Sequence, residues 1–505
     1  MQPIICLLVF LSVMLTFNET LAQPAEGTRP RRTPPRISGI EMFIPSDGAP
    51  DIGVAVKVSF PKRERYPDGS PVVIHVTGGL GNNGLNVQGG NMTGHGFVEV
   101  RFAFAGGGPP GHRSGGTWDF RGKNSLRMMA DVTRFVLGQI PNKDGQYLQE
   151  ISDDIRILSH IVGYAGWSHG GNASVISLAE HGDEYPDFAF VATHESPLGD
   201  GIISAELGGF GTAPNPAYNP DTGVLDLSLL AYDPNITTLR PRRGGRPGRQ
   251  QNPQVAEMMG ALYYDCNRNG QLDEEGDFRL SPVLVELPGK APMAPFSVQV
   301  LEEVERRNLI PGEWPKHMLS LSDARKFWPM RDAGTRISEA VENCPEVMVI
   351  AYGNEVDHVQ RTVDHVHVLT VVKGFLDAGA RFVRLNPDRS YVENVSGSKA
   401  PAVADNPAGI HYDHMSIRSA LEPRAEKGRQ DRLYIAASIC ELADRAYTKN
   451  TEPNLDANNL NTQAVGAASD GGIGRRILWG RPLWAPACLH QYIEQATTHF
   501  WHLFP

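Results

Sequence analysis

The chain has 505 residues, of which 41% are hydrophobic and 8% aromatic, a composition typical of a globular protein with a large core. This length accommodates one large domain with insertions, or two to three domains. The formal net charge of −10 argues against a nucleic-acid partner as the main role, because phosphate-binding proteins carry an excess of Lys and Arg.

The N-terminal residues predict export. Residues 4–17 are almost entirely apolar, and Thr20-Leu21-Ala22 resembles a small-residue cleavage site. We therefore expect a signal peptide over 1–22, a secreted or periplasmic protein, and no stable membrane insertion once the signal is removed. An N-terminal membrane anchor is the alternative, because no Lys or Arg precedes the apolar run. Residues 23–36, rich in Pro and Arg, are expected to form a linker.

Four cysteines follow the predicted signal peptide: Cys266, Cys344, Cys440 and Cys488. In an exported protein they permit two disulfides, and the sequence does not choose among the pairings. None of them forms a Cys-x-x-Cys pair, so a structural zinc site is not indicated.

Strands and helices alternate over residues 37–197. Two strands over 37–44 and 52–60 are separated by turn residues and predict a hairpin. The continuous apolar run 71–77 predicts a strand that is buried on both faces. Further predicted elements are a strand over 97–104, a helix over 125–138, a strand that ends at 167, a helix over 172–182 and a strand over 188–192.

This alternation stops at residue 198 and resumes at 341. Residues 198–340 are loop-rich and predict an insertion. The later elements are a strand over 346–352, a helix over 363–377, a strand over 381–385 and a helix over 431–446. Alternating strands and helices predict an α/β fold with a doubly wound, mainly parallel sheet, built from 37–197 and 341–446.

Two other segments lie outside the predicted sheet. The basic stretch 240–249 is expected to be a solvated, flexible loop, with a polyanion contact as the minority alternative. Residues 447–505 form a C-terminal extension, in which Trp479, Trp484 and Trp501 are interpreted as packing residues rather than a sugar-binding platform.

The run Gly166-Trp167-Ser168-His169-Gly170 matches the pattern G-x-S-x-G. A strand-like run precedes it and a helix-like run follows it, which is the context of a nucleophile elbow. In such a turn the serine sits between strand and helix with its oxygen exposed. Ser168 is therefore the predicted nucleophile.

The order of elements resembles the α/β-hydrolase fold, with the insertion where that family often carries a lid or cap. The resemblance implies a triad in the order Ser, acid, His. Ser168 matches the nucleophile. Asp357, in Gly353-Asn354-Glu355-Val356-Asp357, matches the acid, with Glu355 as the weaker candidate. His414, in His414-Met415-Ser416, matches the histidine, with His411 as the alternative and His365 and His367 ranked lower.

The resemblance also implies an oxyanion hole. One donor is the backbone N–H of His169, which follows the nucleophile. The second is expected from Gly79 or Leu80, because Thr77-Gly78-Gly79-Leu80 occupies the place of the family's His-Gly-Gly loop. Thr replaces His there. No cofactor is expected for catalysis.

A second motif lies in the insertion. Asp265, Asn267, Asn269 and Asp273 occupy loop positions that carry oxygen ligands in an EF-hand-type calcium loop, and Gly270 takes the turn position. Gln271 would contribute its backbone carbonyl. Gly276 replaces the usual bidentate Glu, and Glu275 or Asp277 could substitute for it. The loop resembles those of dockerin or thrombospondin-type repeats, so we expect a structural Ca²⁺, with a metal-free Asx-rich turn as the alternative.

These features predict a secreted serine hydrolase that cleaves carboxylic esters of a small molecule or a polymer. A serine peptidase of the prolyl-oligopeptidase type is the first alternative, because such enzymes share the fold and the elbow. A non-catalytic binding protein on a hydrolase scaffold is the second. The substrate cannot be read from the sequence, because specificity in this fold depends on the insertion and loops.

Overall fold

The computed structural model describes residues 39–79, 81–86, 91–197, 204–208, 214–219, 224–238, 258–273, 275–280, 284–285, 287–353, 366–397 and 430–451. The chain divides into two units, residues 1–38 and 39–505, and all described residues belong to the second. The predicted signal peptide, the linker, the basic stretch 240–249 and the C-terminal extension beyond residue 451 lie outside the described residues.

An eight-stranded sheet forms the centre of the fold, in the order β1-β2-β4-β3-β5-β6-β12-β13. The β1–β2 and β2–β4 pairs are antiparallel, and the pairs from β4 through β3 to β13 are parallel. The strands are β1 (Ile40–Ile44), β2 (Val54–Ser59), β3 (Ser70–Val76), β4 (Val98–Phe102), β5 (Ile157–Trp167), β6 (Phe188–His194), β12 (Met348–Tyr352) and β13 (Phe382–Leu385). The predicted hairpin is thus the β1–β2 pair, and every residue of β3 is buried, as its continuous apolar sequence predicts.

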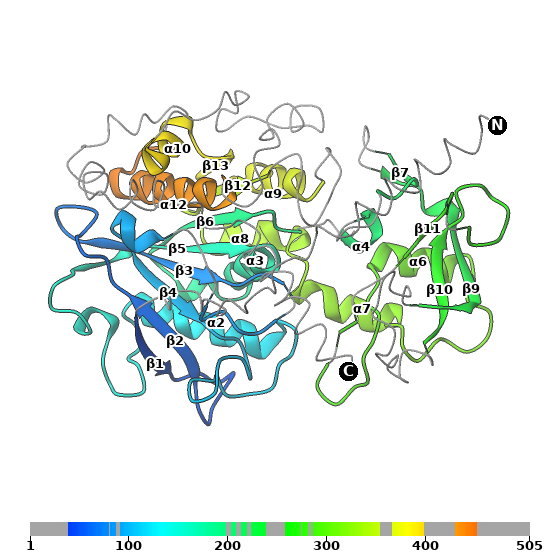
Figure 1. The fold of residues 1–505 in the computed structure, drawn as a ribbon, viewed down its shortest axis with the longest axis horizontal. Coiled ribbons are helices and arrows are strands. Elements are labelled where there is room, and N and C mark those ends of the chain that lie inside the picture. The colour runs from blue at the N-terminus through cyan, green and yellow to red at the C-terminus, as the bar shows by residue number, and fades with distance from the viewer. Residues whose placement is uncertain are drawn as a thin grey trace, which may run out of the picture. The chain divides into compact units, whose positions relative to one another are not determined.

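Helices cover both faces of this sheet (Figure 1). On one face the core includes side chains of α2 (Lys123–Val136), α3 (His169–His181), α8 (Ile337–Asn343) and α9 (Val366–Asp377). On the other face it includes α10 (Arg389–Ser396) and α12 (Gln430–Thr448). The fold class predicted from the sequence is therefore confirmed: a doubly wound, mainly parallel sheet of the α/β-hydrolase type with a large insertion.

The insertion contains more regular structure than its loop-rich sequence predicts. A three-stranded antiparallel sheet, β11-β10-β9, packs with helices around a hydrophobic cluster of its own. Its elements are α4 (Ser204–Leu207), β7 (Tyr218–Asn219), β8 (Val224–Leu225), β9 (Leu230–Thr237), β10 (Met259–Tyr264), β11 (Phe278–Arg279), α6 (Val298–Arg306) and α7 (Leu321–Phe327). Three of these strands have two residues each, too few for an alternating pattern to show.

Short 3₁₀ helices complete the described elements. They are η1 (Met92–His95), η2 (Leu148–Glu150), η3 (Gly182–Glu184), η4 (Leu227–Leu229), η5 (Trp328–Met330) and η6 (Gly334–Arg336). Among the described residues, no helix is long and apolar enough to cross a membrane.

The three cysteines that the structure describes form no disulfide with one another. Cys266, Cys344 and Cys440 are free thiols. Cys344 and Cys440 are buried in the clusters on opposite faces of the sheet, and Cys266 packs against the cluster of the insertion, so layers of structure separate the three. Two disulfides would need all four cysteines, and Cys488 lies outside the described residues.

Candidate active site

Ser168 occupies a sharp turn between β5 and α3. Its backbone has φ 50° and ψ −122°, a combination that a residue with a side chain rarely adopts. The Ser168 N–H donates to the carbonyl oxygen of His194 at 2.8 Å, and the Ser168 carbonyl accepts from the N–H of Gly171 at 2.8 Å. These two hydrogen bonds tie the strained residue to the end of β6 and to the first turn of α3. Strain held in this way at one serine is the local geometry of a nucleophile elbow.

The glycines on either side of Ser168 permit the close approach that this turn requires. A Cβ on Gly166 would lie 2.6 Å from the Cα of Gly171. A Cβ on Gly170 would lie 2.2 Å from the carbonyl oxygen of Val76, at the end of β3. Both distances are far below van der Waals contact with backbone atoms, so a side chain at either position would push α3 away from the strands.

The structure describes two of the predicted oxyanion donors, His169 and Gly79. His169 is the first residue of α3, so its backbone N–H lies at the N-terminal end of the helix. Val76 of β3 pairs with Gly166 of β5, and a Cβ on Gly170 would lie 2.8 Å from the carbonyl oxygen of Thr77, so the segment after β3 begins next to the first turn of α3. Gly79 has φ 65°. Leu80, the alternative donor, lies outside the described residues.

Arg121 holds the segment 77–79 through its guanidinium group. Nη1 donates to the carbonyl oxygen of Gly79 at 2.6 Å, and Nη2 donates to those of Thr77 at 2.9 Å and Gly78 at 3.2 Å. The arginine is 6% exposed. It was not among the residues predicted from the sequence, and its neighbour Gly122 at the start of α2 is the only local signal of an unusual turn.

Two further polar residues lie at the same edge of the sheet. His194 ends β6 and stacks its ring with Tyr352 of β12, with 5.0 Å between ring centroids. Glu195 follows at once, is 4% exposed and has φ 44°, and its N–H donates to the carbonyl oxygen of Tyr352. Because β5 and β6 are parallel, with Trp167 paired to His194, Glu195 is the lateral neighbour of Ser168. The available signal for it was an acidic residue three positions beyond the end of the predicted strand 188–192.

The other predicted triad residues cannot be placed. Asp357, Glu355 and His365, and likewise His411 and His414, lie outside the described residues. His367 is the one candidate histidine that the structure describes. It lies in the first turn of α9 and is buried. Because α9 connects the parallel strands β12 and β13, this turn belongs to the same edge of the sheet as Ser168.

The insertion contacts the loop that carries Arg121. Arg331 donates from Nη2 to the carbonyl oxygen of Asp119 at 2.6 Å and from Nε to that of Phe120 at 2.8 Å. The Phe120 side chain joins Val285, Leu319 and Phe327 in a small hydrophobic cluster. Burial lowers the pKa of Arg331 to about 10, which still leaves the group charged at neutral pH.

The predicted calcium loop is folded around its own side chains. The carboxylate of Asp265 accepts from the N–H groups of Asn269 at 3.1 Å and Gly270 at 2.8 Å. Asp273 accepts from the side-chain amide of Asn267 at 2.8 Å. Asp277 closes the loop, because it accepts from the N–H groups of Cys266 and Asp273.

The carboxylates and amides of this loop are the donor types that a hard cation takes. Within the residues that the structure describes, no group of three or more His, Cys, Asp or Glu side chains is arranged to hold a metal. The calcium loop would rely on Asn side chains and a backbone carbonyl as well as on Asp265 and Asp273.

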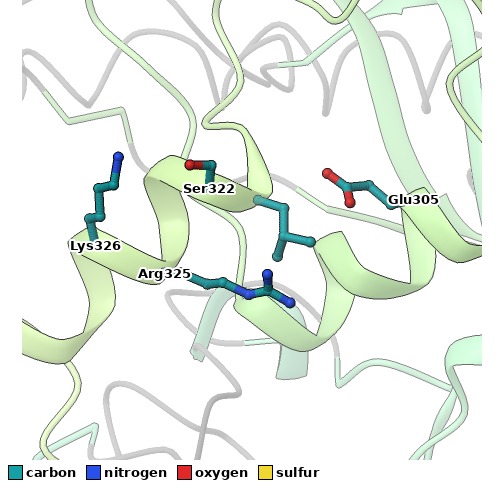
Figure 2. A pocket seen from close by; sticks show the side chains of 5 residues that line it. Glu305, Ser322, Arg325 and Lys326 are labelled. Atoms are coloured by element: carbon teal, nitrogen blue, oxygen red, sulfur yellow. The ribbon is translucent and has the colours of Figure 1, made fainter.

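A hollow of about 360 Å³ lies elsewhere, on the insertion. Glu305 of α6 and Leu321, Ser322, Arg325 and Lys326 of α7 line it (Figure 2). None of these residues is a predicted site residue. The hollow therefore adds nothing to the chemistry at Ser168.

No protein-family model matches the chain, and no curated protein matches it. Solved structures to which it is similar include esterases and an α/β serine hydrolase. An esterase from the hyperthermophilic archaeon Pyrobaculum calidifontis is 15% identical with a TM-score of 0.23, over 35% of this chain and 50% of the esterase. The chain thus spans about half the length of that enzyme.

Two other solved structures show the same range of similarity. Carboxyl esterase 2 from the mycorrhizal fungus Tuber melanosporum is 10% identical with a TM-score of 0.32, over 72% of this chain and 83% of the esterase. An α/β serine hydrolase without a lid from Xanthomonas campestris is 20% identical with a TM-score of 0.19, over 33% of this chain and 65% of the hydrolase. TM-scores this low transfer no residue's role to this chain.

Proposed function

We propose that this protein is a serine hydrolase that cleaves carboxylic esters through an acyl-enzyme on Ser168. The observation that carries the proposal is the backbone of Ser168, held at φ 50° between a buried strand and a helix. A strained backbone at a non-glycine residue costs free energy, and such residues cluster at functional sites. For a serine at the edge of a parallel sheet, the function that fits is to expose a nucleophilic oxygen.

The reaction follows from general chemistry. The Ser168 hydroxyl is a weak nucleophile, so a histidine, predicted to be His414, takes its proton as Oγ attacks the ester carbonyl. The resulting oxyanion accepts hydrogen bonds from the N–H of His169 and from the segment that follows β3. The histidine then gives its proton to the departing alcohol. Water attacks the acyl-enzyme by the same route, which releases the acid and restores the hydroxyl.

A carboxylate should orient the histidine and stabilise its charged form. Asp357 is the proposed residue. Glu195 is a second candidate, since it is buried beside Ser168. Replacing each with its amide separates them: Asp357→Asn should lower kcat by about 10⁴-fold if Asp357 orients the base, and Glu195→Gln should then have a much smaller effect.

The proposal is tested by labelling with a fluorophosphonate probe, which reacts with activated serines. Labelling of the wild type that disappears in Ser168→Ala supports a serine hydrolase. The absence of labelling in a folded wild type would overturn it and favour the non-catalytic alternative. Rates on p-nitrophenyl acyl esters and on peptide anilides then distinguish an esterase from a peptidase.

Two substitutions assign the histidine. His414→Ala should abolish both labelling and ester hydrolysis, whereas His411→Ala should leave them close to the wild type. The reverse result would make His411 the base. Loss of activity only in His367→Ala would instead place the base on α9.

We also propose that the loop 265–277 binds a structural Ca²⁺. Asp265, Asn267, Asn269 and Asp273 would supply side-chain oxygens, and Gln271 its carbonyl. The ion would tie down the loop that connects β10 to β11, and it would take no part in catalysis.

A further inference from the structure

We infer that Arg121 is the positioning residue of the oxyanion hole: its guanidinium gathers three successive carbonyls and thereby sets the direction of the N–H donors that follow β3. This inference rests on the proposed hydrolase function and adds a residue that the elbow motif does not predict. Arg121 does not touch the reacting atoms. It acts through the segment Thr77-Gly78-Gly79.

The geometry of the peptide unit makes this connection. A trans peptide is planar, so its N–H points away from its C=O. The carbonyls of Thr77, Gly78 and Gly79 all accept from the two terminal nitrogens of Arg121. Fixing the oxygens of Thr77 and Gly78 on the arginine side turns the N–H groups of Gly78 and Gly79 to the opposite side. Gly78 and Gly79 have no Cβ to restrict their backbone angles, so their own conformational preferences are weak. The hydrogen bonds from Arg121 hold the segment in one conformation.

Arg121 is buried and packs against two aromatic rings. Its guanidinium carbon lies 5.3 Å from the ring centroid of Phe104 and 5.9 Å from that of Trp118, distances at which a cation is attracted to an aromatic ring. The planar fork presents donors on separate nitrogens in a fixed geometry, whereas the three donors of a lysine ammonium all lie on one compact, rotating group.

The backbone of Arg121 is also supported from the insertion. Arg121 has φ 58° and Phe120 has φ 53°, so two consecutive side-chain-bearing residues lie in the left-handed region. Arg331 binds the carbonyl oxygens of Asp119 and Phe120 and so fixes the peptides just before Arg121. The Asp119 carboxylate accepts from the N–H of Gly122 at 3.0 Å and from that of Asn124 at 2.9 Å, which caps α2. The insertion and α2 therefore both fix the residue that orders the oxyanion segment.

The variant that isolates this role is Arg121→Gly. Glycine tolerates φ 58°, so the substitution removes the fork without adding backbone strain. We expect kcat on p-nitrophenyl acetate to fall by about 10²-fold, the scale of losing one oxyanion donor, with KM changed by no more than a few-fold. Ethylguanidinium, added at a concentration that leaves the wild type unaffected, should restore part of the lost kcat. Arg121→Lys keeps the charge but not the fork and should be impaired as well.

The matched control is Arg127→Gln. Arg127 lies on α2 and binds the Glu184 and Asp131 carboxylates, away from the segment 77–79. Its replacement should leave kcat unchanged, and ethylguanidinium should have no effect on it. A kcat of Arg121→Gly within twofold of the wild type would overturn the inference. If Arg121→Gly does not fold, the same criterion applies to Arg121→Lys.

A second measurement does not depend on activity. Amide hydrogen exchange, followed by mass spectrometry, should be faster in Arg121→Gly for peptides that cover 77–79 and unchanged for those that cover β5 and α3. Unchanged exchange over 77–79 would show that Arg121 does not hold the segment. Failure of the wild type to label with fluorophosphonate would overturn the hydrolase proposal instead, and the exchange result would still decide what Arg121 holds.

Discussion

The side-chain oxygen of Asn172 accepts a hydrogen bond from the backbone N–H of Ala333 at 2.9 Å. The Nδ2 of the same carboxamide donates to the carbonyl oxygen of Pro197 at 3.1 Å. Pro197 directly precedes the predicted insertion, and Ala333 lies near its end. Asn172 is in the first turn of α3, just after Ser168, and is 2% exposed. One buried side chain thus fastens both ends of the insertion to the helix that follows the nucleophile.

Replacing Asn172 with Ala should destabilise the fold. Two buried backbone groups would lose their partner, and each such loss costs about 1–3 kcal/mol, so we expect the free energy of unfolding to fall by about 2–6 kcal/mol. Urea unfolding followed by tryptophan fluorescence measures it. Asn343→Ala is the control: its Nδ2 donates to the Ala179 carbonyl at 2.9 Å from a partly buried site, and its loss should cost only about 1 kcal/mol. Equal stability of Asn172→Ala and the wild type would show that the two bonds contribute nothing.

Gly170→Ala should disrupt the elbow itself. The added Cβ would lie 2.2 Å from the Val76 carbonyl oxygen, so α3 must move away from β3, and a shift of about 1 Å at a reacting group can cost about 10²-fold in rate. We expect ester hydrolysis to fall by about that factor, with a lower melting temperature. Gly81→Ala is the matched control, because nothing lies within 4 Å of the added atom. Wild-type activity in Gly170→Ala would contradict the tight approach of α3 to β3.

The elements around Ser168 could be predicted because their signals are local. The apolar run of β3, the hairpin of β1 and β2, and the strand–helix pair around the elbow each follow from residues next to one another in sequence. Helix α10 was not predicted, because it spans only eight residues. Its main signals are at its ends: the Asp388 side chain caps the N-terminus by accepting from the Ser390 N–H, and Gly397 ends the helix with φ 64°. Periodicity is weak over so short a helix.

The residues that support the site could not be predicted, because their contacts join distant segments. Arg121 binds the carbonyls of residues 77–79, which lie more than forty positions before it in the sequence. The residues next to Arg121 give no indication of these partners. Arg331 reaches Asp119 and Phe120 across still longer separations. Glu195 could be predicted only in part. The sequence shows that it follows a strand, but its position next to Ser168 depends on the β5–β6 register, which the sequence does not give.

Stability should fall at acidic pH in part because of His95. Burial, followed by the positive charge of Arg65, lowers the pKa of His95 to about 4, from an ordinary value of 6.5. The unfolded chain therefore binds a proton at higher pH than the folded protein does. The stability that the neutral histidine contributes is present above about pH 6.5 and is lost as the pH falls towards about 4.

Unfolding free energies measured between pH 8 and pH 4 test this expectation. One proton bound on unfolding gives a slope of at most about 1.4 kcal/mol per pH unit in that window. His95→Gln should reduce the slope there and leave it unchanged above it. Glu99 affects stability in a lower pH range. Burial raises the pKa of its carboxyl group, but His75 and Arg101 outweigh that effect and lower the pKa to about 2. The stability that ionised Glu99 contributes is therefore lost only as the pH falls below about 4.5. An identical slope in His95→Gln would exclude His95 as the cause.

Removing calcium should lower the melting temperature. Without the ion, the carboxylates of Asp265 and Asp273 in one exposed loop would be held together only by hydrogen bonds to N–H groups and amides. An ion present at about 100 times its dissociation constant would stabilise the fold by about 2.7 kcal/mol. Melting curves in excess calcium and in excess chelator measure the difference. Asp265→Asn should abolish the calcium dependence, whereas Asp226→Asn, which alters an exposed cap that accepts from the Ser228 N–H, should retain it. A melt that chelator leaves unchanged would show that this is a metal-free Asx turn, since binding to the folded state alone must shift the transition.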